Sequence, residues 1–416
     1  MEYPIEKYEE QATDTFGRLC KIFKDVYKPN AWQIGNVFDT LTDYVFRYSE
    51  PTPGGVVQTA RDRWEELGTM CWYDDYGWWG IASSKAFDIT FANVFGSNQA
   101  YFQKVATDCW DVMHTGKPDQ PPYKWKGGPN VWDNRDDGDT PGYFMSLDGW
   151  AVPRFPGGVW QWDMFKCKRT KPPECSPSNP ADPAKCLLGP FQNTVMNGLY
   201  LVLALRLAML NKGTGTVAAA KSELEFLNNW FAVEGTDSLL EDFSGSNLVR
   251  ERVGTYAFQI AKNRYPKVNG YHWQDFWCGD QGLIFGGLLD YFALDSSDPA
   301  VETQAVAIAR GVFQHLVDAN GVMPYSFGFH DQNDPDDYSC GSGVFWRYML
   351  RAFNQNPALR TEVLNMIASD PEGNPIYKSA EGAFARVKGN NNQLFAYFNV
   401  LAVLIAAIDI LRQAND

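Results

Sequence analysis

The sequence predicts an all-α protein in which helical hairpins form a toroid around a central cleft. Apolar residues recur at three- and four-residue intervals along most of the chain, and strand-like patterns are few. Short loops between the helices are typical of antiparallel hairpins, whereas one long stretch lacks periodicity. Of the 416 residues, 45% are hydrophobic and 21% are charged, which is enough apolar material for a large core. Because no shift in composition marks a second domain, we expect one domain over residues 1–416.

The helical periodicity is continuous in nine segments. They comprise residues 5–27, 56–69, 99–114, 194–210, 217–231, 279–294, 301–318, 343–354 and 391–411. A further helix should begin near Tyr76, within an aromatic segment. Pro299 and Pro357 follow turn-forming residues, and Thr216 is a plausible N-cap for the helix at 217–231.

Between residues 115 and 191 the periodicity fails, and Pro, Gly, Asp and Trp become frequent. This composition predicts long loops, which a compact domain usually retains for a function. We expect the loops to wall the cleft, because their tryptophans are costly to leave in water. These tryptophans are Trp125, Trp132, Trp150, Trp160 and Trp162.

An inserted Pro- and Cys-rich loop at about residues 163–190 stands out within this stretch. It contains Cys167, Cys175 and Cys186, and a disulfide would stabilise the chain most at this place. The other five cysteines are scattered singly, as buried thiols often are. The sequence therefore leaves open whether this loop is bridged.

The charge and the apolar runs argue against several partners. A net charge of -14 would repel a nucleic-acid backbone. The longest apolar run, residues 400–408, is shorter than the roughly 20 residues that span a bilayer, so we expect no membrane span. No signal peptide is visible, and we expect a secreted or periplasmic protein only if a leader was removed. We expect a monomer.

Two aspartates stand side by side in a segment, residues 70–80, that is otherwise almost wholly aromatic and apolar. Charges in such surroundings are expensive unless they are paired or used. Two carboxylates this close, walled by indole rings, are driven toward different pKa values, so that one stays an anion and one keeps its proton. Cleavage of a glycosidic bond requires this division of labour. The pair Asp74 and Asp75 therefore indicates a carbohydrate-active enzyme.

The alternative is that one aspartate caps the helix that begins near Tyr76, since Asp is a favoured N-cap. Capping explains one carboxylate and leaves the other unexplained. Side chains of neighbouring residues diverge, and two diverging carboxylates could bracket one sugar carbon at the roughly 5 to 5.5 Å spacing of retaining glycosidases. We therefore expect Asp74 and Asp75 to be the catalytic pair of a retaining enzyme.

Aromatic and amide side chains are the candidates for sugar binding. Nine of the fifteen tryptophans lie between Trp72 and Trp162, and flat rings pack on the C–H faces of sugars while amides bond hydroxyls. The candidate substrate-binding residues are Trp72, Tyr73, Trp78, Trp79, Trp160, Trp162, Asn193, Asn197, Asp280 and Gln281. For the aromatic residues the alternative is ordinary core packing, and for Asn193 and Asp280 it is helix capping.

No metal or other cofactor is expected. The acidic stretches 133–139 and 331–337 lack the spacing of a calcium loop and are better explained as solvated turns. The four histidines show no zinc-ligand spacing, and the sequence has no nucleophile elbow or Walker loop.

Five segments together resemble glycoside hydrolase family 76, which includes endo-α-1,6-mannanases and, in fungi, related cell-wall transglycosidases. They are the paired aspartates with the aromatic helix that follows, a Gly-Gly-x-Trp segment, a Gln-Asn-x-x-x-Asn-Gly helix start, an Asp-Gln-Gly helix start and a Gly-x-Phe-x-Arg-Tyr helix. In this sequence they occupy residues 74–82, 157–160, 192–205, 280–287 and 343–348. Each segment alone is weak evidence, but five in the family's order are fairly specific.

The resemblance implies an (α/α)6 toroid and a retaining double displacement. It assigns Asp74 as the nucleophile and Asp75 as the acid/base, with hydrolysis of α-1,6-mannan as the expected reaction. The sequence departs from the family in its longer loop at 163–190 and in Asp280, which replaces the usual Asn. The alternatives are transglycosylation of an α-mannan or related α-glycan, a catalytically inactive sugar-binding relative, and an epimerase, for which histidine bases would be expected.

Overall fold

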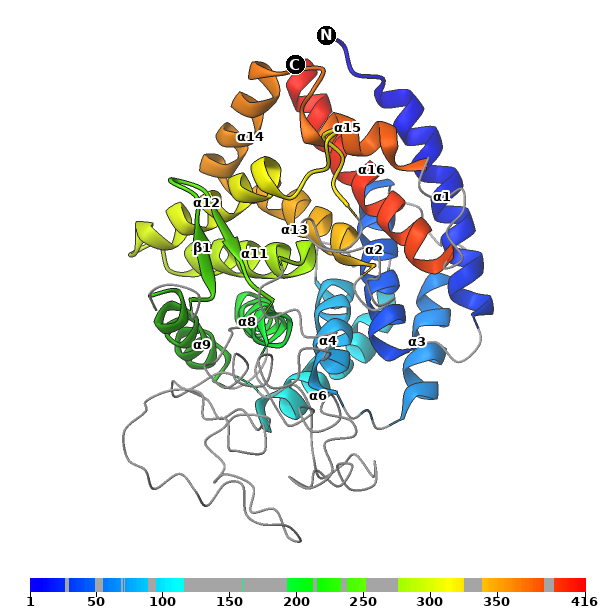
Figure 1. Ribbon diagram of the computed structural model, residues 1–416. Coiled ribbons are helices and arrows are strands. Elements are labelled where there is room, and N and C mark those ends of the chain that lie inside the picture. Colours follow the sequence, from blue (N-terminus) through cyan, green and yellow to red (C-terminus); the bar gives the residue numbers. More distant parts are fainter. Residues whose placement is uncertain are drawn as a thin grey trace, which may run out of the picture.

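The computed structural model describes most of the helical chain. The described residues are 1–26, 30–48, 55–68, 70, 72–88, 95–115, 159, 193–211, 215–232, 238–251, 276–324, 339–384 and 393–416. Within these ranges the protein is almost wholly helical, with a single two-stranded hairpin (Figure 1). The predicted all-α fold class is confirmed. The inserted loop at 163–190, both acidic stretches and all five loop tryptophans, Trp160 and Trp162 included, lie outside the described residues.

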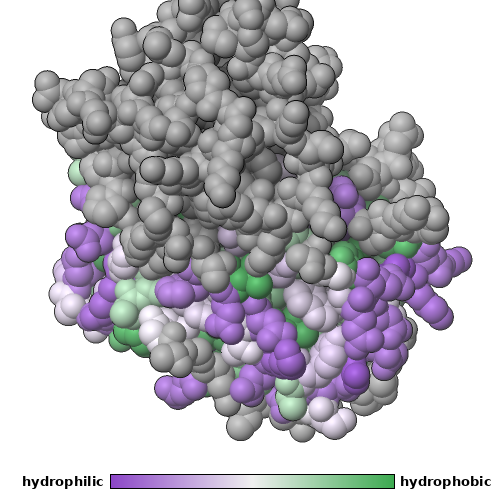
Figure 2. All heavy atoms as spheres, turned by 90° about the horizontal axis from the view of Figure 1, so that it is seen from below, coloured by the Kyte–Doolittle hydropathy of each residue, from purple (hydrophilic) through white to green (hydrophobic). Residues whose placement is uncertain are grey.

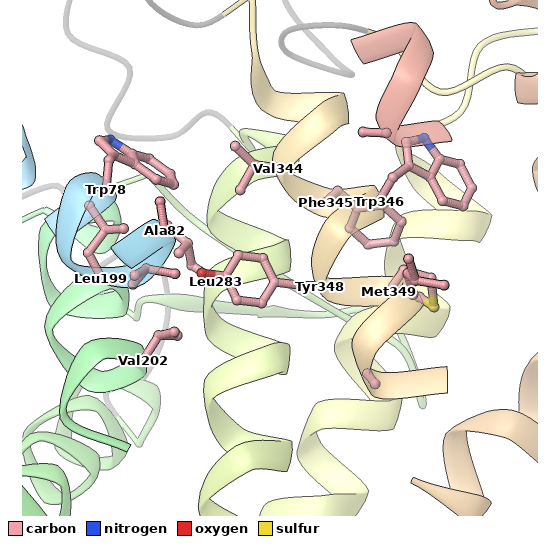
Figure 3. Packing of buried hydrophobic residues seen from close by; sticks show 14 of the residues in the cluster. Trp78, Ala82, Leu199, Val202, Leu283, Val344, Phe345, Trp346, Tyr348 and Met349 are labelled. Atoms are coloured by element: carbon pink, nitrogen blue, oxygen red, sulfur yellow. The ribbon is translucent and has the colours of Figure 1, made fainter. Parts of the chain in front are cut away.

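Six described helices form an inner ring in which each helix contacts the next, and the last one closes against the first. In ring order they are α2 (Ala31–Tyr48), α4 (Tyr73–Phe87), α8 (Thr194–Met209), α11 (Cys278–Leu294), α13 (Gly341–Gln355) and α16 (Gln393–Asn415). The interior of the ring is packed with buried side chains from these helices, among them Leu199, Leu283 and Tyr348 (Figure 3).

A second set of helices covers the ring from outside, and each of them packs on at least one inner helix. These outer helices are α1 (Ile5–Asp25), α3 (Val56–Leu67), α6 (Gln99–Thr115), α9 (Thr216–Phe231), α12 (Pro299–His315) and α14 (Pro357–Ser369). The remaining elements are a 3-10 turn, η2 (Gly96–Asn98), the antiparallel strands β1 (Leu240–Asp242) and β2 (Asn247–Val249), and α15 (Pro375–Gly382). This arrangement is the (α/α)6 toroid.

The inner helices are parallel to one another. Near their N-termini, Trp32 of α2 stacks on Phe395 of α16 with ring centroids 5.2 Å apart. Toward their C-termini, Asp290 of α11 pairs with Arg206 of α8 at 3.1 Å and with Arg351 of α13 at 2.8 Å. Starts contact starts and ends contact ends, so the N-termini of the inner helices gather at one end of the toroid.

Glycines allow the inner helices to approach one another closely. A Cβ added to Gly282 of α11 would lie 2.8 Å from the Cα of Phe345 in α13, and one added to Gly80 of α4 would lie 2.6 Å from Leu203 of α8. Such distances are far below van der Waals contact, so larger side chains would push the ring apart.

Buried charges hold the ring together in its interior. Lys85 of α4 contacts Asp39 at 2.5 Å and Asp43 at 2.6 Å, both on α2, and Arg347 of α13 reaches Asp39 at 2.9 Å. Burial alone would raise the pKa of Asp39, but the charges of Lys85 and Arg347 outweigh it and lower that pKa. For Asp43 burial dominates and raises the pKa. Asp39 is therefore an anion that depends on its two cationic partners.

Some predicted boundaries differ from the structure. The helices α2 and α14 were not predicted, and α4 begins at Tyr73 rather than near Tyr76. The prediction that Thr216 caps a helix was wrong, because Thr216 is the first residue of α9 and the N-cap is Gly215, which makes no side-chain cap bond. Pro357, predicted to mark a turn, starts α14 behind the N-cap Asn356.

Four cysteines lie in the described part of the chain, Cys20, Cys109, Cys278 and Cys340, and of these Cys20 and Cys109 are free thiols. This agrees with their predicted character as scattered single thiols. The possible bridge among Cys167, Cys175 and Cys186 concerns residues outside the described ranges.

Helix α16 is long and apolar enough, by length and composition alone, to cross a membrane over Leu394–Asn415. The sequence criterion missed it because it counted only the uninterrupted run 400–408. In the structure 89% of its most apolar window is buried, against α1 and α13 among others, as in a core helix. On the face that Figure 2 shows, hydrophilic residues are the most frequent of those described, with smaller hydrophobic areas between them. The large exposed hydrophobic side chains of the described residues are distributed along the sequence: Met1, Phe46, Val217 and Leu294.

Replacing Gly282 by Ala should destabilise the toroid. The new Cβ would meet the backbone of Phe345, which cannot rotate away, so we expect the free energy of unfolding to fall by about 1–3 kcal/mol. Gly17→Ala, at an exposed position of α1 where a Cβ meets nothing within 4 Å, should instead raise it by about 0.5–1 kcal/mol. Urea unfolding of both variants measures the difference, and equal effects would contradict close helix approach at Gly282.

Replacing Lys85 by Met should remove the ammonium group that pairs with the buried Asp39 and Asp43. We expect this to lower the free energy of unfolding by about 3–5 kcal/mol at pH 7. The folded-state pKa of Asp39 is lowered, so its contribution is present above the unfolded pKa, about 4, and is lost as the pH falls through the folded pKa. The penalty of the variant should therefore shrink below about pH 4. Urea unfolding at several pH values tests this, and a penalty independent of pH would refute it.

Candidate active site

The paired aspartates lie in the first turn of α4, at the end of the toroid where the inner helices begin. The N-cap of α4 is Trp72, whose backbone is extended and whose side chain makes no cap bond. Asp74 and Asp75 occupy the second and third helical positions, so neither of them is the N-cap. Both carboxylates are at the positive end of the helix dipole, which favours negative charge.

Asp75 also meets the start of α2. Its carboxylate Oδ1 accepts a hydrogen bond from the backbone N–H of Trp32 at 2.9 Å, and its side chain is 8% exposed. The first N–H groups of a helix have no partner within the helix, so this carboxylate satisfies one of them. Asp74 is more exposed, and its Oδ1 accepts the N–H of Asp75 at 3.0 Å. The site thus combines one accessible carboxylate with one that is buried and fixed.

The aromatic residues around the pair differ in exposure. Trp72 is partly exposed, whereas Tyr73 and Trp78 are almost fully buried. Trp78 lies on the inner side of α4, facing the interior of the ring (Figure 3). Trp79 is wholly buried, and its Nε1–H donates to the carbonyl oxygen of Ala31 at 2.9 Å. Its ring therefore belongs to the core between α2 and α4.

Asn193 and Asn197 organise the start of α8. Asn193 is the N-cap, and its side chain accepts the N–H of Met196 at 3.1 Å. Asn197 donates through Nδ2 to the carbonyl of Asn193 at 2.7 Å and accepts the N–H of Val159 at 2.8 Å. The capping alternative for Asn193 is thus observed, and Asn197 anchors Val159. This anchoring of Val159 was not predicted from the sequence.

Gln281 and Asp280 lie in the first turn of α11, and both are fully buried. Gln281 accepts the N–H of Val249 at 2.8 Å and donates to the carbonyl of the same residue at 2.6 Å, so it pairs with the end of β2 as a neighbouring strand would. The next residues of this hairpin reach α8, where Thr194 donates its N–H to the carbonyl of Glu251 at 2.9 Å. The hairpin therefore joins the starts of α8 and α11.

The structure brings the predicted site residues that it describes to the N-caps and the first two turns of three neighbouring inner helices. Asp74 and Asp75 belong to α4, Asn197 to α8, and Asp280 and Gln281 to α11. Three of these residues carry carboxyl groups, Asp74, Asp75 and Asp280, and helix dipoles favour negative charge at helix starts. The contribution of α2 was not predicted, because the Trp32 N–H is a backbone group and leaves no trace in side-chain patterns.

No protein-family model and no curated protein matches the sequence. Solved structures match over almost its full length. A structure of an α-1,6-mannanase of family GH76 from Salegentibacter sp. HEL1_6 in complex with α-1,6-mannotriose is 12% identical, with a TM-score of 0.58, covering 96% of this chain and 99% of that one. That protein is an inactive variant in which two consecutive aspartates are replaced by asparagine.

Two further solved structures are similar to this chain at comparable identity and coverage. A GH76 α-mannanase from Bacteroides thetaiotaomicron is 12% identical with a TM-score of 0.58, covering 98% of this chain and 97% of that one. Dfg5 from Chaetomium thermophilum, in complex with glucosamine, is 13% identical with a TM-score of 0.56, covering 93% and 82%. At such identities the likeness establishes the fold. The chain has the (α/α)6 toroid fold of the family 76 glycoside hydrolase structures.

Proposed function

We propose that the protein is a retaining glycoside hydrolase that cleaves α-1,6-mannosidic linkages within mannan-type polysaccharide. The observation that carries this proposal is the placement of Asp74 and Asp75 together in the first turn of an inner helix. A mannanase of the same fold is inactive when two consecutive aspartates are replaced by asparagine, which supports the same role for this pair. Its complex with α-1,6-mannotriose supports the choice of sugar and linkage.

The environments of the two aspartates support different roles. Asp74 is the more exposed and is suited to attack the anomeric carbon of the sugar. Asp75 is buried, and its Oδ1 accepts the Trp32 N–H; in the proposed mechanism its Oδ2 carries the proton that the leaving oxygen needs. Two adjacent carboxyl groups in an apolar setting cannot both ionise cheaply, which favours one anion and one acid.

The proposed reaction proceeds in two displacements. In the first, a carboxylate oxygen of Asp74 bonds to the anomeric carbon, the glycosidic C–O bond breaks, and Asp75 gives its proton to the departing oxygen. In the second, Asp75 takes a proton from water, the water oxygen bonds to the anomeric carbon, and the ester to Asp74 breaks. The product keeps the α configuration, and both aspartates return to their starting states.

We propose that side chains around the pair bind the sugar chain. Trp72 adjoins the aspartates and is partly exposed, and in this proposal its ring stacks on a sugar. Trp160 and Trp162 follow Val159, which Asn197 anchors at the start of α8, and they remain candidates for the same role. Gln281 and Trp79 donate hydrogen bonds to backbone carbonyl groups, so in this proposal they hold the surrounding backbone in place and do not bind the sugar.

The substitutions Asp74→Asn and Asp75→Asn test the proposal. Each should lower kcat on α-1,6-mannan by about 10²–10⁴-fold, because one removes the nucleophile and the other the acid/base. Asp62→Asn, which changes an exposed carboxylate on the outer helix α3, is the matched control and should leave kcat unchanged. Activity is measured as reducing ends released, and product chromatography separates internal cleavage from release of single sugars.

NMR of the first product formed gives the second test. We expect the α anomer to appear first, whereas the β anomer would show inversion and would exclude a covalent intermediate on Asp74. Products longer than the substrate would show transglycosylation instead of hydrolysis. Full activity in both Asp→Asn variants would refute the catalytic role of the pair.

A further inference from the structure

One peptide group of α2 is held from both sides by α4. The carbonyl oxygen of Ala31 accepts the Nε1–H of Trp79 at 2.9 Å, and the N–H of Trp32 donates to Asp75 Oδ1 at 2.9 Å. The carbonyl of Ala31 and the N–H of Trp32 belong to the same amide. Asp75 and Trp79 are four residues apart and therefore lie on one face of α4.

This arrangement couples the buried indole to the carboxylate of Asp75. A donor at the carbonyl end of an amide polarises the amide and strengthens the hydrogen bond that its N–H makes. The bond from Trp79 also fixes the orientation of the Ala31–Trp32 peptide at the start of α2, where helix ends usually fray. Trp79 itself is wholly buried, and this peptide is its hydrogen-bonded link to Asp75.

A second brace reaches the same turn of α2 from α13. Arg347 donates through Nη2 to Asn36 Oδ1 at 2.6 Å, and Asn36 donates through Nδ2 to the carbonyl of Trp32 at 3.0 Å. Asn36 and Arg347 are both buried, and Arg347 is further tied to α2 through Thr40 at 3.0 Å. The two peptide groups that flank the Cα of Trp32 are thus held separately, one by Trp79 and one by Asn36.

We propose that Trp79 and Asn36 are positioning residues for catalysis. They fix the start of α2 so that the Trp32 N–H holds Asp75 Oδ1, and with it the orientation of the carboxyl group that protonates the glycosidic oxygen. This inference rests on the proposed function, because it assigns a role in setting the geometry of Asp75. The alternative is that both side chains only fill or stabilise the core, in which case they affect folding but not the chemical step.

The substitution Trp79→Phe separates these roles, because it removes the Nε1–H donor and keeps a large aromatic ring. Trp346→Phe is the matched control: Trp346 is equally buried, and its Nε1 makes no hydrogen bond in the described part of the chain. Both changes should lower the unfolding midpoint. Only Trp79→Phe should lower kcat on α-1,6-mannotriose, by about 10- to 100-fold, with KM changed less than about twofold.

The second brace has its own variant pair, which also serves if Trp79→Phe does not fold. Asn36→Asp keeps an acceptor for Arg347 but removes the donor to the Trp32 carbonyl, so kcat should fall as in Trp79→Phe. Thr40→Val removes a bond to Arg347 without touching Trp32, so it should reduce stability while kcat is retained.

Asp75→Asn, assayed in parallel, distinguishes failure of this inference from failure of the proposed function. If Asp75→Asn is inactive while Trp79→Phe and Asn36→Asp keep the wild-type kcat, the positioning role is overturned and the catalytic role stands. An equal loss of kcat in Trp346→Phe would assign the effect to core packing and would also overturn the inference. If Asp75→Asn is fully active, the proposed function itself fails.

Discussion

The parallel alignment of the inner helices is the constraint on which the candidate site depends. It gathers helix starts at one end of the toroid, and the N–H groups there lack partners within their own helices. A carboxylate placed among them is stabilised without a metal or a cationic side chain. For Asp75 the gathered helix starts fix the orientation of the side chain, because it lies in the first turn of α4 and its Oδ1 accepts the N–H of Trp32 in the first turn of α2.

Buried ion pairs join the same helices further from their N-termini. Lys85 joins α4 to α2 through Asp39 and Asp43, and Asp290 joins α11 to α8 and α13. Such pairs are strongly destabilising to break, although replacing them whole by apolar residues is often tolerated. Their value here is geometric, because each fixes how two helices lie relative to each other. By fixing the helices, the ion pairs also fix the relative positions of the carboxylates at the helix starts.

The sequence predicted the fold class and most helices well, and the exceptions have a physical cause. Helix α2 was missed because its buried face carries Asn36, Asp39 and Thr40, which break the apolar periodicity. These side chains are buried at little cost only because Lys85 and Arg347 come from other helices to meet them. A single-sequence pattern contains no information about such partners.

For the site, the sequence could point to the paired aspartates because adjacent charges in an aromatic segment are unusual. It could not assign the residues around them. Clustered aromatics occur in cores and at sugar-binding surfaces alike, and only the structure places Trp79 in the core and leaves Trp72 partly exposed. Gln281 and Asn197 pair with the backbone of Val249 and Val159, contacts between positions far apart in the sequence.

In the proposed mechanism Asp74 forms a covalent bond to the sugar, while Asp75 donates a proton to the leaving oxygen and then accepts one from water. Trapping the intermediate with an activated fluoro-sugar of the mannose series, followed by mass spectrometry of the peptides, tests it most directly. We predict one added fluoro-sugar, attached to the peptide that contains Asp74 and absent in Asp74→Asn. Attachment at another residue, or turnover of the reagent with no labelled protein at any time, would contradict the account.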